Sequence, residues 1–243
     1  VPAANFPIEW LTVQGLRGKG IKALALAPFK LLQACWQDWQ ILKRHQPRAV
    51  LGMGGFAAGP GGLMAWLMRI PLVIHEQNSI IGMTNKILSR FARVCLFAFP
   101  QAAQGICHAS VVGNPVRRDI LDIQDPKQRL AGRDQQSMKI LVLGGSLGAR
   151  TLNRVVPAAL ALLPLAQRPE VIHQCGRAHL QDCQQAYQDN SVQAEVRDYI
   201  EDMKVAYEWA DLVICRAGAL TVAELSAAGI ASILVPFPFA VDD

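Results

Sequence analysis

Several motifs that would assign a chemistry directly are missing from the sequence. It contains no Walker A phosphate loop, no D-x-D pair of carboxylates, and no set of His, Cys and acidic residues at metal-ligand spacing. Its six cysteines include no C-x-x-C pair, and several lie in apolar stretches. These absences argue against a nucleoside triphosphatase, a zinc site and a disulfide framework. We therefore predict reduced, buried thiols in a cytosolic protein, with no metal or other cofactor.

Acidic residues are scarce in the first half of the chain. Residues 1–116 contain 11 Lys and Arg against 3 Asp and Glu, whereas residues 117–243 contain 13 against 16. This asymmetry predicts two domains, 1–116 and 117–243, with different partners. The basic half suits an anionic membrane surface, a phosphorylated lipid or nucleic acid. The alternative is an ordinary solvated basic surface.

Long uninterrupted apolar runs are also absent. Residues 49–68 form a stretch of 20 residues without a charge, but this stretch holds six glycines and Pro60. We interpret it as a strand, a glycine-rich turn and a helix rather than a membrane span. There is no recognisable signal peptide, residue 1 is Val, and the last residues leave a strand. These features predict a fragment of a longer protein.

What remains is a globular composition, 51% hydrophobic and 18% charged over 243 residues. This composition excludes disorder for the bulk of the chain and provides for a substantial core. Predicted strands alternate with predicted helices, which is typical of parallel βαβ units. The prediction is an α/β fold of two tandem Rossmann-like, doubly wound parallel-sheet domains, both truncated. Ligands bind such sheets beyond the carboxyl ends of the strands.

The element pattern restarts after a polar segment, residues 118–137, which we interpret as a linker. The predicted strands are residues 8–13, 48–52, 71–75, 94–99 and 110–113 before it, and 138–143, 171–174, 192–196, 211–215 and 231–236 after it. In the first half, one predicted helix ends near residue 46 and two others cover 59–68 and 84–92. In the second half, one predicted helix runs from the turn at 144–148 to about residue 163, and three others cover 178–188, 202–209 and 219–228.

Two glycine-containing turns in the second half predict diphosphate binding. Gly144-Gly-Ser-Leu-Gly148 follows a strand and opens a helix, so its backbone N–H groups can approach an anion, with Ser146 as an extra donor. The run from Cys215 to Glu224 repeats this arrangement and adds Arg216. A carboxylate at Glu224 can accept hydrogen bonds from a sugar diol. The first turn alone is equally compatible with a tight connection that binds nothing, and the second with a helix that has a favourable first-turn Thr and Glu, but the pair favours a nucleoside diphosphate.

The first half holds a competing motif. Residues 52–57 match the dinucleotide-binding pattern G-x-G-x-x-A, and Glu76 lies 24 residues after Gly52, which supports an oxidoreductase hypothesis. Pro60 and the additional glycines break the usual helix start and argue against it. Glu76 also belongs to His75-Glu-Gln-Asn78, four adjacent polar side chains after a buried strand, which suit a polar ligand such as a sugar.

A further motif, Gly113-Asn-Pro-Val-Arg117, closes the first half. Asn-Pro favours a turn, and we expect Arg117 to enter the space between the domains, where a guanidinium can hold a phosphate. The alternative is an ordinary surface arginine.

These motifs together resemble one known family. Their order and approximate spacing are similar to those of the bacterial MurG family, the peptidoglycan N-acetylglucosaminyltransferases. The resemblance runs over the whole chain and rests on the ordered set Gly15–Gly20, Gly52–Gly55, His75–Asn78, Gly113–Arg117, Gly144–Ala149 and Cys215–Ala219. It implies a fold of the GT-B glycosyltransferase type. It also implies inverting transfer of GlcNAc from UDP-GlcNAc to the 4-hydroxyl of MurNAc in undecaprenyl-pyrophosphoryl-MurNAc-pentapeptide.

The resemblance also implies site residues. Ile200 would contact uracil through its backbone, Glu224 the ribose hydroxyls, and Ser146 and Arg117 the diphosphate or sugar. The general base would lie in a family loop that precedes residue 1, and no metal is implied. The implied UDP-GlcNAc contacts are Asn78, Arg117, Ser146, Ile200, Ala219, Leu220, Thr221, Val222, Ala223 and Glu224, and the residues suggested for the acceptor or a phosphate are His75, Glu76 and Arg216.

A membrane partner follows from the same resemblance, because the family works on a lipid-linked acceptor at the cytoplasmic face of the inner membrane. The implied location is peripheral, at anionic lipid, and nucleic acid is not a partner. The alternative is that the aromatic stripe that includes Trp36 and Trp39 belongs to the core. The residues expected at the membrane are Lys19, Lys22, Phe29, Lys30, Leu32, Trp36 and Trp66.

Two other functions stay open at this point. A related UDP-sugar transferase would use a different lipid acceptor, such as diacylglycerol. A membrane-surface binding module built on the basic helix would have no enzymatic activity.

Overall fold

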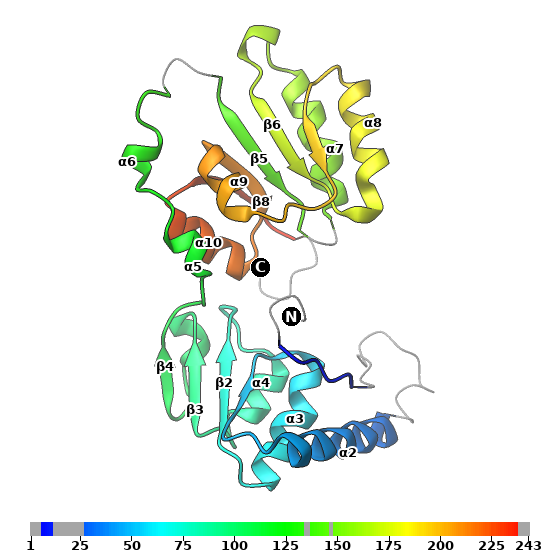
Figure 1. Ribbon diagram of the computed structural model, residues 1–243, viewed down its shortest axis with the longest axis vertical. Coiled ribbons are helices and arrows are strands. Elements are labelled where there is room, and N and C mark those ends of the chain that lie inside the picture. The colour runs from blue at the N-terminus through cyan, green and yellow to red at the C-terminus, as the bar shows by residue number, and fades with distance from the viewer. Residues whose placement is uncertain (1–5, 12–26, 134–136, 146–147, 238–243) are drawn as a thin grey trace. The chain divides into compact units, whose positions relative to one another are not determined.

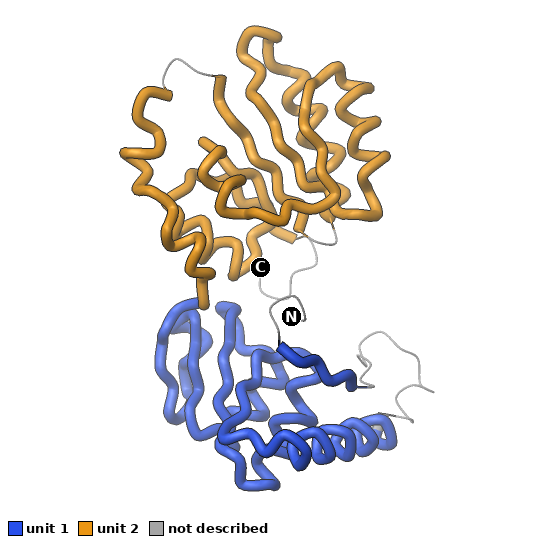
Figure 2. The backbone as a smooth tube through the Cα atoms, in the orientation of Figure 1, with its two compact units in different colours: residues 1–114 blue, residues 115–243 orange. Residues whose placement is uncertain are grey.

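The structure is a computed structural model that describes residues 6–11, 27–133, 137–145 and 148–237. The chain divides into two compact units, Val1–Asn114 and Pro115–Asp243 (Figure 2). The sequence-based boundary lies between residues 116 and 117.

Unit 1 is built on a four-stranded parallel sheet with the strand order β1-β2-β3-β4 (Figure 1). Leu72 and Ile74 of β2 pack with Cys95 and Phe97 of β3 in the core of this unit. Alternate residues of a strand point to opposite faces, so this spacing of two places all four side chains toward one core. The strands are β1 (Val50–Gly52), β2 (Leu72–Glu76), β3 (Val94–Phe97) and β4 (Ala109–Val111).

The helices of unit 1 are α2 (Ala27–His45), α3 (Gly55–Leu67) and α4 (Met83–Leu88), with a short 3-10 turn η2 (Pro100–Ala103). Helix α2 packs against α3, and α3 packs against α4. A side chain at Gly62 would stand 2.7 Å from Leu88, so glycine there permits the close approach of α3 and α4.

Two predictions for unit 1 are wrong. Helix α3 begins at Gly55 rather than at residue 59, because Gly54 and Gly55 adopt left-handed φ angles of 79° and 76° that turn the chain sharply after β1. Pro60 therefore lies inside the helix instead of preventing its start. Residues 8–11 form no strand, and residues 12 and 13 of that prediction lie outside the described residues.

Unit 2 contains a five-stranded parallel sheet with the order β7-β6-β5-β8-β9. The chain runs outward from β5 to β7 and then restarts beside β5 at β8, so the strand order reverses between β5 and β8. The predicted fold class, two tandem parallel α/β sheets, is confirmed. The strands are β5 (Lys139–Leu143), β6 (Glu170–Gln174), β7 (Glu195–Arg197), β8 (Leu212–Arg216) and β9 (Ala231–Val235).

Strand β5 shows why helices cover both faces of this sheet. Ile140 and Val142 pack in a core cluster with residues of two helices, whereas Leu141 and Leu143 pack in a second cluster with residues of three others. A strand buried on both faces is apolar along its buried positions, here residues 140–143. The first pair of helices is α7 (Arg150–Ala161) and α8 (Leu180–Asp189), and the second group is α5 (Arg118–Leu121), α9 (Met203–Trp209) and α10 (Ala219–Ala228) (Figure 1).

The polar segment 118–137 is not a linker, contrary to the interpretation from its sequence. It contains α5 and a further short helix, α6 (Pro126–Arg129), and Ile120 is fully buried in the core of unit 2. Arg129 donates hydrogen bonds to the carbonyls of Ala228 (2.9 Å) and Gly229 (3.1 Å) at the end of α10. The segment is polar because its carboxylates and cations cap short helices, as Asp125 does for α6.

Across the described part of the chain, no helix has both the length and the apolar character required to cross a bilayer. The uncharged stretch 49–68 forms β1, the turn and α3, as the sequence predicts.

Candidate functional site

The carboxyl ends of β5 and β8 are the starting point for a site in unit 2. These strands are neighbours, and the chain leaves each of them for a helix, α7 after β5 and α10 after β8. Ligands of doubly wound sheets bind where the strand order reverses, because the connections diverge there and leave helix N-termini facing solvent. The two glycine-containing turns singled out in the sequence both lie at this place.

The turn after β5 needs its glycines for backbone packing. The Gly144 N–H donates to the Gln174 carbonyl at 2.9 Å, and a Cβ at Gly144 would stand 2.9 Å from both that oxygen and the Ala149 nitrogen. Gly148 has a φ of 77°, and a Cβ there would overlap the Cys175 carbonyl. The turn is therefore held tightly against the end of β6. Ser146, the predicted hydroxyl donor, lies outside the described residues.

Gln174 is a residue of this site that sequence reasoning missed. Its backbone carbonyl accepts from Gly144, and its side-chain carbonyl accepts from the Ile200 N–H at 3.3 Å. Gln174 thus connects the glycine turn to Ile200, the predicted uracil contact, whose side chain is buried. A polar residue at the carboxyl end of a buried apolar strand was the available sequence signal.

The turn after β8 leads directly into α10. Gly218 precedes the helix, and its carbonyl accepts from the Val222 N–H at 2.9 Å. The predicted donor contacts from Ala219 to Glu224 form the first turns of α10, where the helix dipole favours an anion. The Arg216 guanidinium donates to the Pro236 carbonyl at 2.8 Å and lies 5.8 Å from the centre of the Phe237 ring.

Arg117 and Glu224, predicted separately, lie together in the structure. The Arg117 Nε is 3.3 Å from Glu224 Oε1, while the Tyr207 hydroxyl donates to Glu224 Oε2 at 3.1 Å. Sequence reasoning did not identify Tyr207, whose side chain is 1% exposed in the core of unit 2. Burial, together with the adjacent Glu224 carboxylate, raises the pKa of Tyr207. The phenol therefore stays protonated at neutral pH and remains a hydrogen-bond donor.

In unit 1, Glu76 organises the loop after β2. Its Oε1 accepts from the backbone N–H and the side-chain amide of Asn78, both at 3.1 Å. Its Oε2 accepts from the Gly82 N–H at 3.0 Å and from Asn85 Nδ2 at 2.9 Å. Both oxygens of this buried carboxylate are thus bound within its own loop. That arrangement removes the support for Glu76 as the carboxylate of a dinucleotide site.

His75 joins two of the sequence motifs. Its Nε2 lies 3.0 Å from the Gly113 carbonyl, so the motif after β2 meets the motif at the end of the unit. Asn114 strengthens this connection, because its side-chain amide donates to the Gln77 carbonyl at 3.0 Å. His75 is buried, and its Nδ1 has no hydrogen-bond partner within the described residues. Asn78, in contrast, is exposed.

The predicted membrane residues form an exposed face on α2 of unit 1. Phe29, Leu32 and Trp36 are 71%, 67% and 59% exposed, and we call these three residues the α2 apolar face. The alternative, a buried aromatic stripe, is wrong for this helix, since Ala34 and Asp38 are the residues it buries. Lys30 and Trp66 are also exposed, whereas Lys19 and Lys22 lie outside the described residues.

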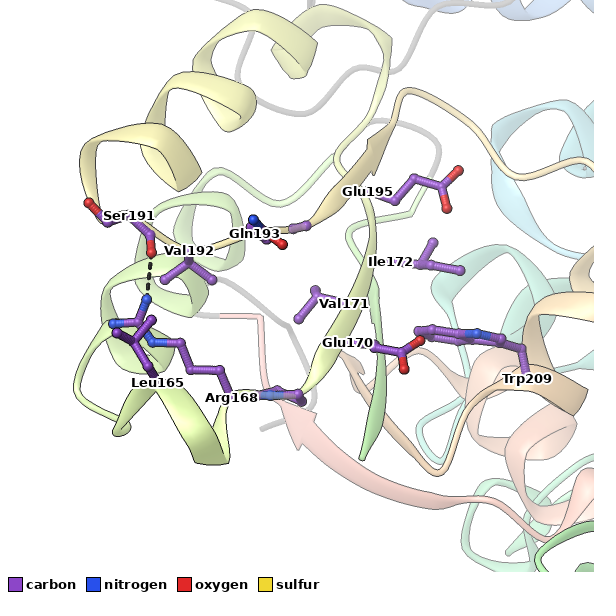
Figure 3. A pocket seen from close by; sticks show the side chains of 12 residues that line it. Leu165, Arg168, Glu170, Val171, Ile172, Ser191, Val192, Gln193, Glu195 and Trp209 are labelled. Atoms are coloured by element: carbon purple, nitrogen blue, oxygen red, sulfur yellow. Dashed lines mark hydrogen bonds between the residues drawn. The ribbon is translucent and has the colours of Figure 1, made fainter. Parts of the chain in front are cut away.

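Neither a metal site nor a second ligand site is supported within the described residues. In the part of the chain that the structure describes, no group of three or more His, Cys, Asp or Glu side chains is arranged to hold a metal ion. A hollow of about 750 Å³ lies beside Glu170, Ile172 and Trp209 (Figure 3). It is at the amino end of β6, the end opposite to the carboxyl ends of the strands where such sheets bind ligands.

Comparison with known proteins agrees with this arrangement. The glycosyltransferase family 28 N-terminal domain matches residues 1–96, and the glycosyltransferase family 28 C-terminal domain matches residues 139–243. The UDP-N-acetylglucosamine–N-acetylmuramyl-(pentapeptide) pyrophosphoryl-undecaprenol N-acetylglucosamine transferases of Marinobacter nauticus and Alkalilimnicola ehrlichii are 54% and 55% identical to this chain. These alignments cover 98% and 100% of this chain, but 66% and 68% of the relatives.

A solved structure extends the comparison to three dimensions. The crystal structure of MurG from Acinetobacter baumannii is 40% identical and matches with a TM-score of 0.73, over 99% of this chain and 67% of that one. The chain thus spans about two thirds of the length of the relatives that it matches. Since relatives at this identity share both halves of the fold and the match is continuous through both units, the chain belongs to the MurG family of glycosyltransferases.

Proposed function

We propose that the protein transfers GlcNAc from UDP-GlcNAc to the 4-hydroxyl of MurNAc in lipid-linked MurNAc-pentapeptide, with inversion at the anomeric carbon. The observation that carries this proposal is the meeting of Arg117, Tyr207 and Glu224 beside the start of α10. A cation, a helix N-terminus and a fixed carboxylate are the groups that a nucleoside diphosphate requires. The names of the relatives identify the sugar and the lipid-linked acceptor.

Donor binding is divided among three elements of unit 2. The carboxylate of Glu224 accepts hydrogen bonds from the ribose hydroxyls, and the backbone at Ile200 contacts the uracil. The diphosphate lies at the first turn of α10, beside the turn after β5. Arg117, half exposed and 3.3 Å from Glu224, reaches the same space and contacts the diphosphate or the sugar.

The chemical role of these groups is electrostatic. When the acceptor hydroxyl attacks the anomeric carbon, the bond to UDP breaks and negative charge accumulates on the β-phosphate. Backbone N–H groups at a helix start are fixed in advance, and the Arg117 guanidinium is free to move toward that charge, so both stabilise it in the transition state. In unit 1, Glu76 holds the side-chain amide of Asn78 in place.

Calorimetric titration of UDP-GlcNAc, with UDP-glucose as the comparison ligand, tests the donor site in the complete gene product. We expect saturable binding of UDP-GlcNAc that Glu224→Ala weakens at least about tenfold, because a charged hydrogen-bond acceptor is lost. Glu170→Ala is the matched control, since Glu170 is exposed at the amino end of the same sheet. Absence of UDP-GlcNAc binding by folded protein would contradict the proposal.

The acceptor is tested separately with lipid-linked MurNAc-pentapeptide and with diacylglycerol. Transfer to the first and not to the second is the expected result. Transfer to diacylglycerol alone would instead favour a related UDP-sugar transferase with a different lipid acceptor.

A peripheral position at the cytoplasmic face of the inner membrane is part of the same proposal. The α2 apolar face supports it, because exposed aromatic side chains beside basic residues partition into an anionic interface. We expect Trp36→Ser to lower binding to vesicles of phosphatidylglycerol and phosphatidylcholine in a sedimentation assay. Leu165→Ser removes an exposed apolar side chain from unit 2 and should leave vesicle binding unchanged. Equal losses for both variants would argue against the α2 apolar face.

A further inference from the structure

In unit 2, the Glu224 carboxylate lies between a buried phenol and a guanidinium and contacts both. Tyr207 comes from α9, Glu224 from α10, and Arg117 from the residue that precedes α5. The Tyr207 hydroxyl binds one oxygen of Glu224 at 3.1 Å, and Arg117 Nε lies 3.3 Å from the other. The two partners differ in their surroundings, because the Tyr207 side chain is inside the core while the Arg117 side chain is 48% exposed.

The core fixes the position of the Tyr207 ring. It belongs to the same buried cluster as Leu141, Val213 and Leu225, which come from two central strands and from α10. A close-packed ring of this kind cannot change its rotamer without displacing its neighbours. Its hydroxyl is therefore an immobile donor, whereas an exposed arginine can exchange one acceptor for another.

We propose that Tyr207 is a positioning residue that holds the Glu224 carboxylate in the orientation needed to accept both hydroxyls of a ribose, so that it determines selectivity for ribonucleotides. This inference rests on the proposed function, because it assigns a role within the same donor site. Each carboxylate oxygen has two lone-pair sites. Oε2 can accept from Tyr207 and from one ribose hydroxyl, while Oε1 accepts from the other hydroxyl.

Without the phenol, Arg117 becomes the main partner of Glu224. A guanidinium favours a two-bond pairing with a carboxylate, and that geometry uses the lone pairs that the ribose requires. A neutral donor on one side prevents this pairing while the carboxylate keeps its charge. Burial of Tyr207 supports the arrangement, because the raised pKa keeps the phenol protonated throughout the physiological range.

The test compares UDP with 2′-deoxy-UDP, titrated by calorimetry into the complete gene product and its Tyr207→Phe variant. We expect the wild-type protein to prefer UDP at least about tenfold, as for a hydrogen bond to a charged group. In Tyr207→Phe the affinity for UDP should fall about fivefold, while the affinity for 2′-deoxy-UDP falls less than about twofold. Both ligands are measured on one preparation, so the affinity ratio does not depend on the fraction of folded protein.

Tyr187→Phe is the matched control. Tyr187 is equally buried in unit 2, but its hydroxyl lies 2.9 Å from Nδ1 of His173, away from Glu224. This variant should leave the ratio of the two affinities unchanged. In a Glu224→Gln background, Tyr207→Phe should cause no additional loss of selectivity, because both changes act on the same carboxylate.

The outcomes separate the two proposals. An unchanged UDP preference in Tyr207→Phe would overturn the positioning role and leave the donor site intact. Equal affinities of the wild-type protein for UDP and 2′-deoxy-UDP, or no binding of either, would contradict the ribose assignment of Glu224 and with it the proposed donor site.

Discussion

At the scale of single residues, Gly148 and Gly145 occupy the same turn but meet different constraints. Both have a left-handed φ, 77° and 76°. A Cβ at Gly148 would overlap the Cys175 carbonyl and stand 2.7 Å from the His179 ring, whereas a Cβ at Gly145 would have nothing within 4 Å. The strain of the backbone angle is therefore common to both, and only Gly148 adds a steric conflict with another strand.

This contrast gives a stability prediction. Gly145→Ala should lower the free energy of unfolding by about 1 kcal/mol, the usual effect of a left-handed angle on a residue with a Cβ. Gly148→Ala should lower it by about 3 kcal/mol or more, because overpacking against backbone is added. Urea denaturation of unit 2, followed by Trp209 fluorescence, measures both. Similar losses in the two variants would show that the turn can move away from β6.

Residue patterns predicted the glycine-containing turns of the candidate donor site but not the side chains that support them. The turn after β5 was identified because a strand, glycines and a helix follow one another in sequence. The residues from Gly144 to Gly148 also satisfy the hydrolase pattern G-x-S-x-G, so the pattern alone does not distinguish a phosphate-binding turn from a hydrolase nucleophile, and membership of the glycosyltransferase family favours the former. Tyr207 and Gln174 were not predicted, because each acts through one contact with a distant residue that no local pattern shows.

At the scale of elements, helix α2 exposes apolar side chains on one side and buries a carboxyl group on the other. The α2 apolar face is exposed, while Asp38 is buried against α3 near Gly61. Helix α3 has no charged residue, and Asp38 Oδ2 has no hydrogen-bond partner in the described part of the chain. Burial raises the pKa of Asp38 from 3.8 to about 6. The charged form of this side chain is therefore destabilising above that pH.

Replacement of Asp38 by Asn should stabilise unit 1 at pH 8, by about 2 kcal/mol, and have little effect at pH 4, where Asp38 is already neutral. Thermal unfolding at the two pH values measures the difference. Asp122→Asn, an exposed carboxylate in unit 2, should change neither value. A stabilisation by Asp38→Asn that is equal at both pH values would contradict a buried charge as the cause.

Element prediction succeeded where periodicity was strong and failed where contacts with distant residues decide. The buried strands β2, β5, β6 and β8 were predicted within about two residues, since short apolar stretches between turn residues favour buried strands. The segment 118–137 was interpreted as a linker because it is polar. Its place in unit 2 depends on Ile120, and on Arg129, whose guanidinium satisfies the carbonyls at the end of α10 nearly 100 residues later.

At the scale of the whole molecule, the two units have separate cores and respond differently to pH. Unit 2 buries His173 completely, with Nδ1 2.9 Å from the Tyr187 hydroxyl and Nε2 3.1 Å from Asn153 Oδ1. Burial lowers the pKa of His173 from 6.5 to about 4. Unit 1 buries Asp38, whose pKa is raised to about 6. One unit thus holds a base that resists protonation, and the other an acid that resists ionisation.

The signs of the two effects are opposite between about pH 4 and 6. For His173 the unfolded chain binds the proton more strongly, so this group makes unit 2 more stable as the pH rises. For Asp38 the folded state binds the proton more strongly, so this group makes unit 1 less stable as the pH rises. Each pKa change of about two units corresponds to about 3 kcal/mol over the full window.

Differential scanning calorimetry of the complete gene product between pH 4 and 8 tests this division. We expect His173→Gln to flatten the rise of stability with pH in the unfolding transition of unit 2. We expect Asp38→Asn to flatten the fall of stability with pH in the unfolding transition of unit 1. Each variant should leave the second transition unchanged, because the two groups lie in different compact units. If both variants altered the same transition, the two units would unfold as one cooperative body, and the separate treatment of their stabilities would be wrong.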